Sequence, residues 1–216
     1  MMYSIMQFTE RSAIVLLGSA YLAGIIGIGL PIHPDFVRLT PFNLLLTTAL
    51  ALYFHPWRDA ALQRFAVAAF AVGFGVEALG VNTGFPFGAY AYGEVLGFKV
   101  LGTPPLIGVN WLLTAYCVGA WVCRVLPASG AGLRAAVAAA AMTALDILIE
   151  PVAIRTGMWT WEGGGGVPPQ NYIAWFVVGF GVCYLMFRLG AVRANRVAMA
   201  ALGYQILFFT VLNIWT

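Results

Sequence analysis

Charged side chains are scarce in this sequence. Only 9% of its 216 residues are Asp, Glu, Lys or Arg, whereas a soluble domain carries about 25%. Hydrophobic residues make up 62% of the chain, and the mean hydropathy is +0.88. This composition predicts a protein embedded in a lipid bilayer. The formal charge of +3 comes without any basic run, so no nucleic-acid partner is expected.

Side chains that would hold a cofactor or a metal are also few. The single lysine, Lys99, falls in a loop, which argues against a retinal-type Schiff base inside a helix bundle. His33 and His55 fall on opposite sides of the predicted membrane, so no two-histidine metal site is expected. The chain has no Ser–His–acid set, phosphate-binding Gly loop or cofactor fingerprint. We therefore predict neither a metal nor a cofactor. Three cysteines, odd in number and without a CxxC pair, are expected to be small buried apolar residues: Cys117, Cys123 and Cys183.

Long apolar runs dominate the rest of the chain. Seven are long enough to cross a bilayer, which takes about 20 helical residues. They lack the alternation of a barrel strand, so helices are expected. The prediction is one all-α domain, 1–216, forming a seven-helix membrane bundle. The predicted spans are 12–31, 38–55, 61–80, 105–126, 132–150, 171–189 and 195–215.

Arginine and lysine are distributed unevenly between the connections. Because basic residues concentrate on the cytoplasmic side, the N-terminus is predicted to be cytoplasmic and the C-terminus to lie outside, in a bacterial or archaeal cytoplasmic membrane. The two long connections, 81–104 and 151–170, then lie on the outer side. The predicted cytoplasmic set is Arg11, Arg58, Arg64, Arg124, Arg134, Arg188, Arg193 and Arg196, and the outer set is Arg38, Lys99 and Arg155.

Three carboxylates inside apolar segments give the sharpest functional signal. Glu77 lies near the outer end of the third span, and Asp146 and Glu150 near that of the fifth. Their i, i+4 spacing puts the last two on one helical face. Each charged acid at membrane depth costs roughly 2.5–3.5 kcal/mol, and such residues are usually functional. The alternative is a structural role, with the acids reaching headgroup water or pairing with Arg155 or Asn110.

Aromatic side chains gather on the predicted outer side. An interfacial belt is the ordinary explanation, but a belt should occupy both faces. The excess on one face indicates a pocket lined with aromatic rings, whose faces stabilise a cation. The residues are Phe85, Phe87, Tyr90, Tyr92, Trp111, Trp159, Trp161, Tyr172 and Trp175.

The two long connections share a loose order of features. Each has an acid near a helix end, a loop rich in Gly and aromatics, then Pro, then Asn and Trp in the next helix. Two explanations fit this order. One is a structural duplication within the chain, and the other is that two unrelated loops meet the same requirements at the membrane interface.

Two stretches resemble the carotenoid biosynthesis membrane proteins that include the carotenoid hydratases. They are "GFGVEALGVNTGFPFGAYAYGEVLGFKVLGTPPLIGVNWLL" and "LDILIEPVAIRTGMWTWEGGGGVPPQNYIAWF". The resemblance covers roughly residues 70–185, and Glu150 stands where Asp is often expected. It implies a membrane enzyme that adds water, without a cofactor, to the terminal double bond of an acyclic carotenoid. The family positions are Glu77, Tyr90, Tyr92, Asn110, Trp111, Asp146, Glu150, Trp159, Trp161, Asn171 and Trp175.

That chemistry suits the residues present. A carboxyl buried beside a second carboxyl, as expected if the third and fifth helices meet, keeps its proton and can protonate an alkene. Aromatic faces then stabilise the tertiary carbocation, and a carboxylate, Asn110 or Asn171 orients the water that captures it. Expected partners are the carotenoid, the bilayer and other carotenoid-pathway enzymes.

Three other functions stay open. A lycopene-type cyclase would use the same acid but exclude water. A membrane prenyltransferase would need a second motif like "DILIE", and a seven-helix carrier would need no protonatable acids.

Overall fold

The computed structural model describes residues 8–30, 32–55, 59–163 and 166–215. Within these ranges seven helices are long and apolar enough to cross a membrane, which confirms the predicted seven-span, all-helical class. Six of them are α1 (Glu10–Gly29), α3 (Ala60–Thr83), α4 (Leu106–Val125), α5 (Ala131–Arg155), α6 (Pro169–Leu189) and α7 (Arg196–Trp215). The remaining span, Asp35–Tyr53, combines the short 3-10 helix η1 (Pro34–Leu39) with α2 (Thr40–Tyr53).

The fifth helix is longer than the sequence predicted. Its end was placed at Glu150 because proline usually ends or kinks a helix, but α5 continues through Pro151 to Arg155. Asn213 of α7 donates a 2.8 Å hydrogen bond to the carbonyl of Leu148, one turn before the proline. Membrane helices tolerate proline where neighbouring groups support the backbone in this way.

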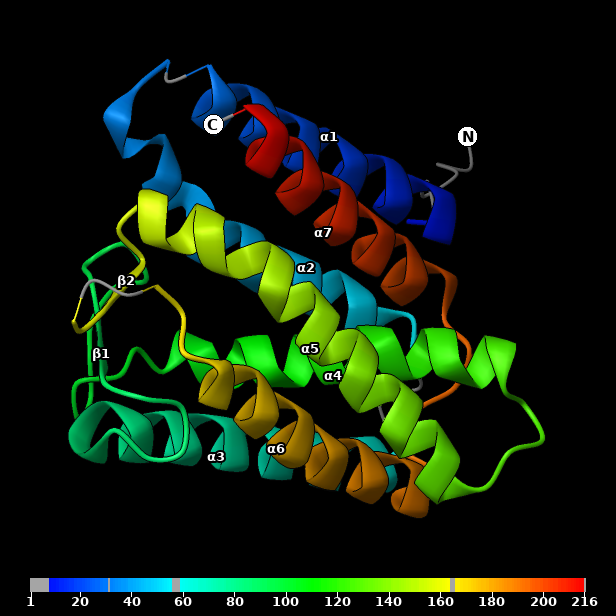
Figure 1. The fold of residues 1–216 in the computed structure, drawn as a ribbon. Coiled ribbons are helices and arrows are strands. Elements are labelled where there is room, and N and C mark those ends of the chain that lie inside the picture. Colours follow the sequence, from blue (N-terminus) through cyan, green and yellow to red (C-terminus); the bar gives the residue numbers. More distant parts are fainter. Residues whose placement is uncertain (1–7, 31, 56–58, 164–165, 216) are drawn as a thin grey trace, which may run out of the picture.

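Small residues let the helices approach closely around α4, the most enclosed of the seven. α5 packs along α6, α1 along α7, and α3 along α4 (Figure 1). At the α5–α6 contact, a Cβ built on Gly179 would lie 3.7 Å from the Cα of Ala139. Such small-residue contacts replace the hydrophobic driving force that is missing between helices in lipid.

Both long connections lie at the same end of the bundle. The strands within them and the last turn of α7 lie at one end in Figure 1, and α1 begins at the opposite end. The two motif loops therefore lie at the end of the bundle where α7 finishes. Arg58, one of the basic residues counted for the orientation, lies outside the described ranges.

A small sheet that the sequence did not predict joins the two connections. Strand β1 (Tyr90–Tyr92) pairs antiparallel with β2 (Trp159–Trp161), with Tyr90 opposite Trp161 and Tyr92 opposite Trp159. Because side chains alternate along a strand, both tyrosines and both tryptophans project to the same face of this sheet. Gly93 makes the close pairing possible, since a Cβ there would lie 2.0 Å from the carbonyl oxygen of Gly157.

Candidate active site

The three predicted acids are buried at the end of the bundle that carries the sheet. Glu77 is 4% exposed, and Asp146 and Glu150 are each 2% exposed. We expected α3 and α5 to meet, but in the described part of the chain they do not pack on each other. Instead, α4 and α6 each pack against both α3 and α5, and the acids face one another across a chamber between these helices.

Glu77 accepts hydrogen bonds from three aromatic side chains. The hydroxyls of Tyr90 and Tyr92 donate to Oε2 at 2.5 and 2.7 Å, and the indole N–H of Trp111 donates to Oε1 at 3.0 Å. Gly73 leaves room for that indole, because a Cβ at this position would lie 2.4 Å from the Cβ of Trp111. Three donors to one carboxyl suit its ionised, acceptor-only form.

Glu150 has a matching environment. The indole N–H groups of Trp159 and Trp161 donate to its Oε2 at 2.9 and 3.0 Å. Asn171 donates through Nδ2 to Asp146 Oδ2 at 2.9 Å and to Glu150 Oε1 at 3.4 Å, so one amide links the two acids. Within the described ranges, Asn171 is the only hydrogen-bond donor to the Asp146 carboxyl.

The two connections therefore use one arrangement twice. Each glutamate accepts from the two alternating aromatics of the strand that follows its own helix, and from a side chain of the next helix. For Glu77 that side chain is Trp111, and for Glu150 it is Asn171. The shared order of features in the sequence thus corresponds to a shared contact geometry.

Aromatic rings enclose the acids. The ring centroids of Tyr90 and Trp161 are 5.0 Å apart, and those of Tyr92 and Trp159 are 6.0 Å apart. Trp111 stacks on Trp175 at 4.2 Å. Aromatic rings thus surround the acids, and π faces of this kind are suited to stabilising a cation. Two of the aromatics expected at the pocket, Phe85 and Tyr172, do not line it.

No basic side chain neutralises the acids. Among the described residues, no ion pair includes Glu77, Asp146 or Glu150. Arg155, the partner considered from the sequence, instead donates to the Leu212 carbonyl and to the Asn213 side chain. Buried carboxyls without a cation are costly when ionised, so the set is suited to holding a proton.

Burial, and then the charge of Glu77, raises the pKa of Tyr90 above the ordinary value for tyrosine, and the same two causes raise the pKa of Tyr92. Both residues lie outside the helices, in β1. Their hydroxyls consequently stay protonated and remain hydrogen-bond donors to Glu77 at any working pH.

The three acids and the predicted substrate-binding residues other than Trp111 line one small cavity, together with Ile107 and Ile149. Its volume is about 30 Å³, which is enough space to hold a water molecule. Trp111 does not line the cavity, and it is connected to it through its hydrogen bond to Glu77. We refer to this cavity as the acid chamber.

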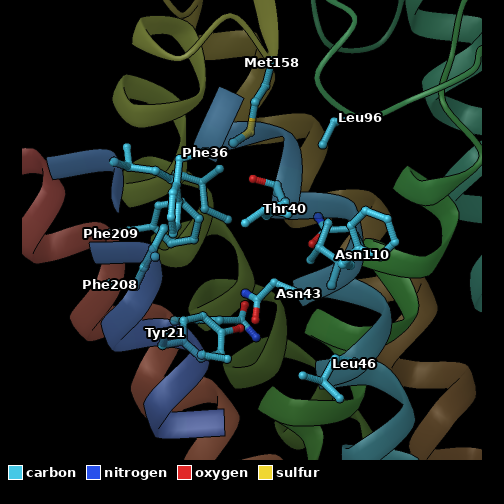
Figure 2. A pocket seen from close by; sticks show the side chains of 18 of the residues that line it. Tyr21, Phe36, Thr40, Asn43, Leu46, Leu96, Asn110, Met158, Phe208 and Phe209 are labelled. Atoms are coloured by element: carbon cyan, nitrogen blue, oxygen red, sulfur yellow. The ribbon is translucent and has the colours of Figure 1, made fainter. Parts of the chain in front are cut away.

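A larger cavity adjoins the acid chamber and was missed from the sequence. It measures about 540 Å³, is lined mostly by apolar side chains of α1, η1, α2 and α7, and shares Ile107, Asn110, Ile149 and Trp159 with the acid chamber. Figure 2 shows its wall, with Phe208 and Phe209 on one side and Asn110 on the other. Its volume is typical of ligand pockets. We refer to it as the apolar cavity.

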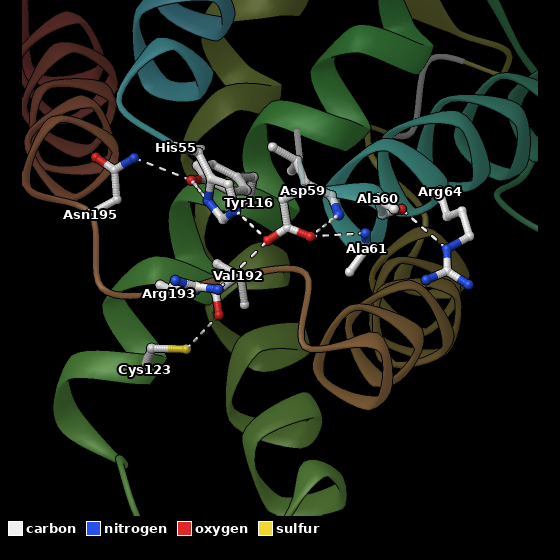
Figure 3. A network of polar contacts seen from close by, with 11 residues as sticks. His55, Asp59, Ala60, Ala61, Arg64, Tyr116, Cys123, Val192, Arg193 and Asn195 are labelled. Atoms are coloured by element: carbon white, nitrogen blue, oxygen red, sulfur yellow. Dashed lines mark hydrogen bonds and ion pairs between the residues drawn. The ribbon is translucent and has the colours of Figure 1, made fainter. Parts of the chain in front are cut away.

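Asp59 lies at the opposite end of the bundle, where it caps the start of α3. Its side chain is 15% exposed and bonds His55 at 3.1 Å, and His55 bonds the Tyr116 hydroxyl at 2.8 Å (Figure 3). Asp59 also accepts from Ala61 N–H at the start of α3. The hydrogen bond from His55 and that cap hold the pKa of Asp59 below its usual value. Asp59 therefore caps the start of α3 and, through His55, links it to the residues that follow α2.

A metal site is not evident in the part of the chain that the structure describes, where no group of three His, Cys, Asp or Glu side chains could hold an ion. The cysteines there are unpaired.

These features define an integral membrane protein whose helix bundle encloses acids beside an apolar cavity. Residues 40–216 match the family described as carotenoid biosynthesis protein, and the chain belongs to this family. It is 30% identical over 194 residues to the bisanhydrobacterioruberin hydratase of Haloarcula japonica, an alignment that covers 87% of this chain and 64% of the relative. The chain thus spans less than two thirds of that relative's length. No solved structure matches it.

Proposed function

We propose that this protein is a carotenoid hydratase that adds water across the terminal double bond of an acyclic carotenoid end. The observation that carries this proposal is the junction of two cavities. The apolar cavity can hold a polyene chain, and the acid chamber, with room for about one water, holds three buried carboxyls. Family membership and the name of the Haloarcula relative support the same reaction class.

Asp146 is our candidate for the proton donor. The other two acids each accept two or more strong hydrogen bonds from aromatic N–H or O–H groups, which favours their ionised forms. Among the described residues, Asp146 accepts only from Asn171. It lies one helical turn from Glu150, whose charge opposes a second charge nearby. Transfer of its proton to the less substituted CH carbon of the terminal double bond leaves a tertiary carbocation on the other carbon of that bond.

The aromatic walls and Asn110 are suited to the second half of the reaction. The faces of Tyr90, Trp159 and Trp161 stabilise the cation without attacking it. Asn110 lines both cavities, and in the described ranges its amide makes no hydrogen bond to the protein, so it is placed to orient the incoming water. Asn171 is less suited to this role, because its amide already donates to Asp146 and Glu150.

The proton balance closes within the chamber. Water adds its oxygen to the cation, and the oxonium that forms loses a proton to a carboxylate, for which Glu150 is the candidate. That proton returns to Asp146, to which Glu150 is linked by Asn171. The net change is alkene plus water to tertiary alcohol, with no oxidation or reduction.

Pigment analysis in engineered cells tests the reaction directly. We expect the full chain, expressed in cells that make lycopene or bisanhydrobacterioruberin, to convert one of them into a more polar pigment heavier by one water per reacted end. The visible spectrum should be nearly unchanged, because the terminal double bond lies outside the conjugated system. Mass spectrometry of extracted pigments measures the outcome.

Two results would contradict hydration. Unchanged pigment pools in both hosts, with the protein present in membranes, would remove the hydratase proposal. A pigment of altered retention but unchanged mass would identify a cyclase instead. Cells with the empty vector provide the background.

We also propose that the acid chamber lies toward the outer face of a bacterial or archaeal cytoplasmic membrane, with the N-terminus inside. The support is the excess of basic residues at the end of the bundle where α1 begins. A reporter active only in the cytoplasm should be silent when fused after Trp215 and active when fused at Ser129, in the α4–α5 connection. An exported phosphatase should give the opposite pattern. The reverse result at both sites would invert the orientation.

A further inference from the structure

The apolar cavity opens on one side of the bundle, between α1 and the η1–α2 segment. A side chain that lines the cavity and is also exposed lies where the cavity meets its surroundings. Among the described residues that line it, the exposed ones are Ala23 of α1, Leu39 of η1 and Phe42 of α2. Leu39 is 50% exposed and Phe42 is 70% exposed. We refer to this opening as the side mouth.

Contact between η1 and α1 limits the cavity toward the end of the bundle. Phe36 of η1 lines the cavity (Figure 2), and a Cβ built on Gly27 of α1 would lie 2.3 Å from its ring. A glycine at this position therefore lets the ring lie against α1. Ala23 precedes Gly27 by about one helical turn, so the side mouth lies further into the bundle than this contact.

The side mouth has the character of a surface that meets lipid. Its three rim residues are apolar, and none of the described residues that line the cavity is charged. An exposed ion pair joins Asp35 to Arg38 of η1 at 3.0 Å, and such charges belong at the level of the headgroups. Phe42 follows Arg38 by about one helical turn, which places the rim in the hydrocarbon below them.

The size of the cavity makes an opening necessary for a long substrate. Its volume of about 540 Å³ is typical of pockets that enclose drug-sized ligands, and an acyclic carotenoid is a much longer molecule. When one end of the polyene lies in the acid chamber, the rest must leave the protein. An exit into lipid keeps that apolar chain out of water.

We propose that the carotenoid binds end-on through the side mouth. One end reaches the acid chamber, the chain behind it fills the apolar cavity, and the remainder passes between Ala23, Leu39 and Phe42 into the bilayer. This assignment rests on the proposed function, since it places the reacting end among the acids. The rim residues then contact only substrates that are longer than the cavity.

Two unreactive probes of different length test this assignment apart from catalysis. Both are acyclic polyenes with saturated ends, one of carotenoid length and one short enough to lie wholly within the cavity. Quenching of tryptophan fluorescence in lipid nanodiscs reports their affinities. Ala23→Phe and Leu39→Trp narrow the side mouth, so each should weaken binding of the long probe by about 10-fold, as expected for overpacking a close-fitting site. Binding of the short probe should stay at the wild-type level.

A matched control comes from another lipid-facing position. Ala71→Phe places the same substitution at an exposed site of α3 that does not line the cavity, and it should bind both probes as the wild type does. Melting temperatures of all variants check that they fold.

Photocrosslinking locates the long probe directly. A benzophenone side chain in place of Phe42 should capture the long probe, and excess short probe should suppress this capture by filling the cavity. The same group in place of Val67, which is 72% exposed on α3, should capture the long probe from the bilayer without such competition.

Several outcomes would overturn the inference. They are a wild type that binds neither probe saturably, rim variants that weaken both probes equally, rim variants that leave the long probe unaffected, and capture at Phe42 that the short probe does not suppress. Since neither probe can be hydrated, none of these outcomes bears on whether a reactive carotenoid gains water, and unchanged pigment pools in the hydration test would not account for them.

Discussion

Asp146→Asn is expected to lower turnover of the carotenoid by about 10²–10⁴-fold, or about 3–5 kcal/mol of transition-state stabilisation. The amide keeps the size of the side chain and its contact with Asn171, but it cannot transfer a proton to an alkene. Because the alkene has no other activation, the loss should fall at the upper end of the range for general acid catalysis.

The measurement is product formed per unit of folded protein in membranes. Asp35→Asn provides the matched control, because that carboxylate is 59% exposed and pairs with Arg38 at the surface, where such pairs contribute little. Asp59 is unsuitable as a control, since its removal would break the helix cap and the bond to His55. Retention of more than about a tenth of wild-type turnover by Asp146→Asn would reassign Asp146 to a structural role.

Glu77→Gln is the second substitution for which we expect a severe loss, of about 10²-fold or more. Its carboxyl accepts from Tyr90, Tyr92 and Trp111, and an amide would direct an N–H₂ group toward at least one of these donors. The substitution removes a negative charge from the chamber and loosens the aromatic wall that faces the cation. Glu150→Gln should be comparably severe for the same reasons.

An independent readout reports the hydrogen bonds to Glu77. Tyr90, Tyr92 and Trp111 donate to its carboxyl, so the amide variant should change the near-ultraviolet absorbance of these rings relative to the wild type. Difference spectroscopy of the purified proteins measures this change. Glu162→Gln, at an exposed position next to β2, should leave both turnover and spectrum unchanged.

Full activity in Glu77→Gln would show that the carboxyl only anchors the sheet. If Asp146→Asn, Glu150→Gln and Glu77→Gln all kept more than about a tenth of wild-type turnover, acid catalysis by this set would be wrong.

The sequence by itself determined the membrane class and the number of spans. Apolar runs of about 20 residues can satisfy their backbone groups in lipid only as helices, so the seven helices could be predicted without tertiary information. The three acids stood out for a related reason: charge at membrane depth is costly, so Glu77, Asp146 and Glu150 were conspicuous in apolar surroundings. Helix ends were less predictable, as α5 running through Pro151 demonstrates.

Only the tertiary structure decided which groups meet. The strands Tyr90–Tyr92 and Trp159–Trp161 are three residues each and far apart in the chain, and a pairing of that kind has no signal in local propensity or periodicity. That pairing places the four aromatic side chains on one face of the sheet. There the two tyrosines donate to Glu77 and the two tryptophans donate to Glu150.

The apolar cavity likewise depends on the packing of α1, α2 and α7. In the sequence, its lining residues are ordinary members of separate apolar runs, and nothing marks them as neighbours. A cavity becomes visible only when the helices that surround it are in place, because it is a property of three-dimensional packing.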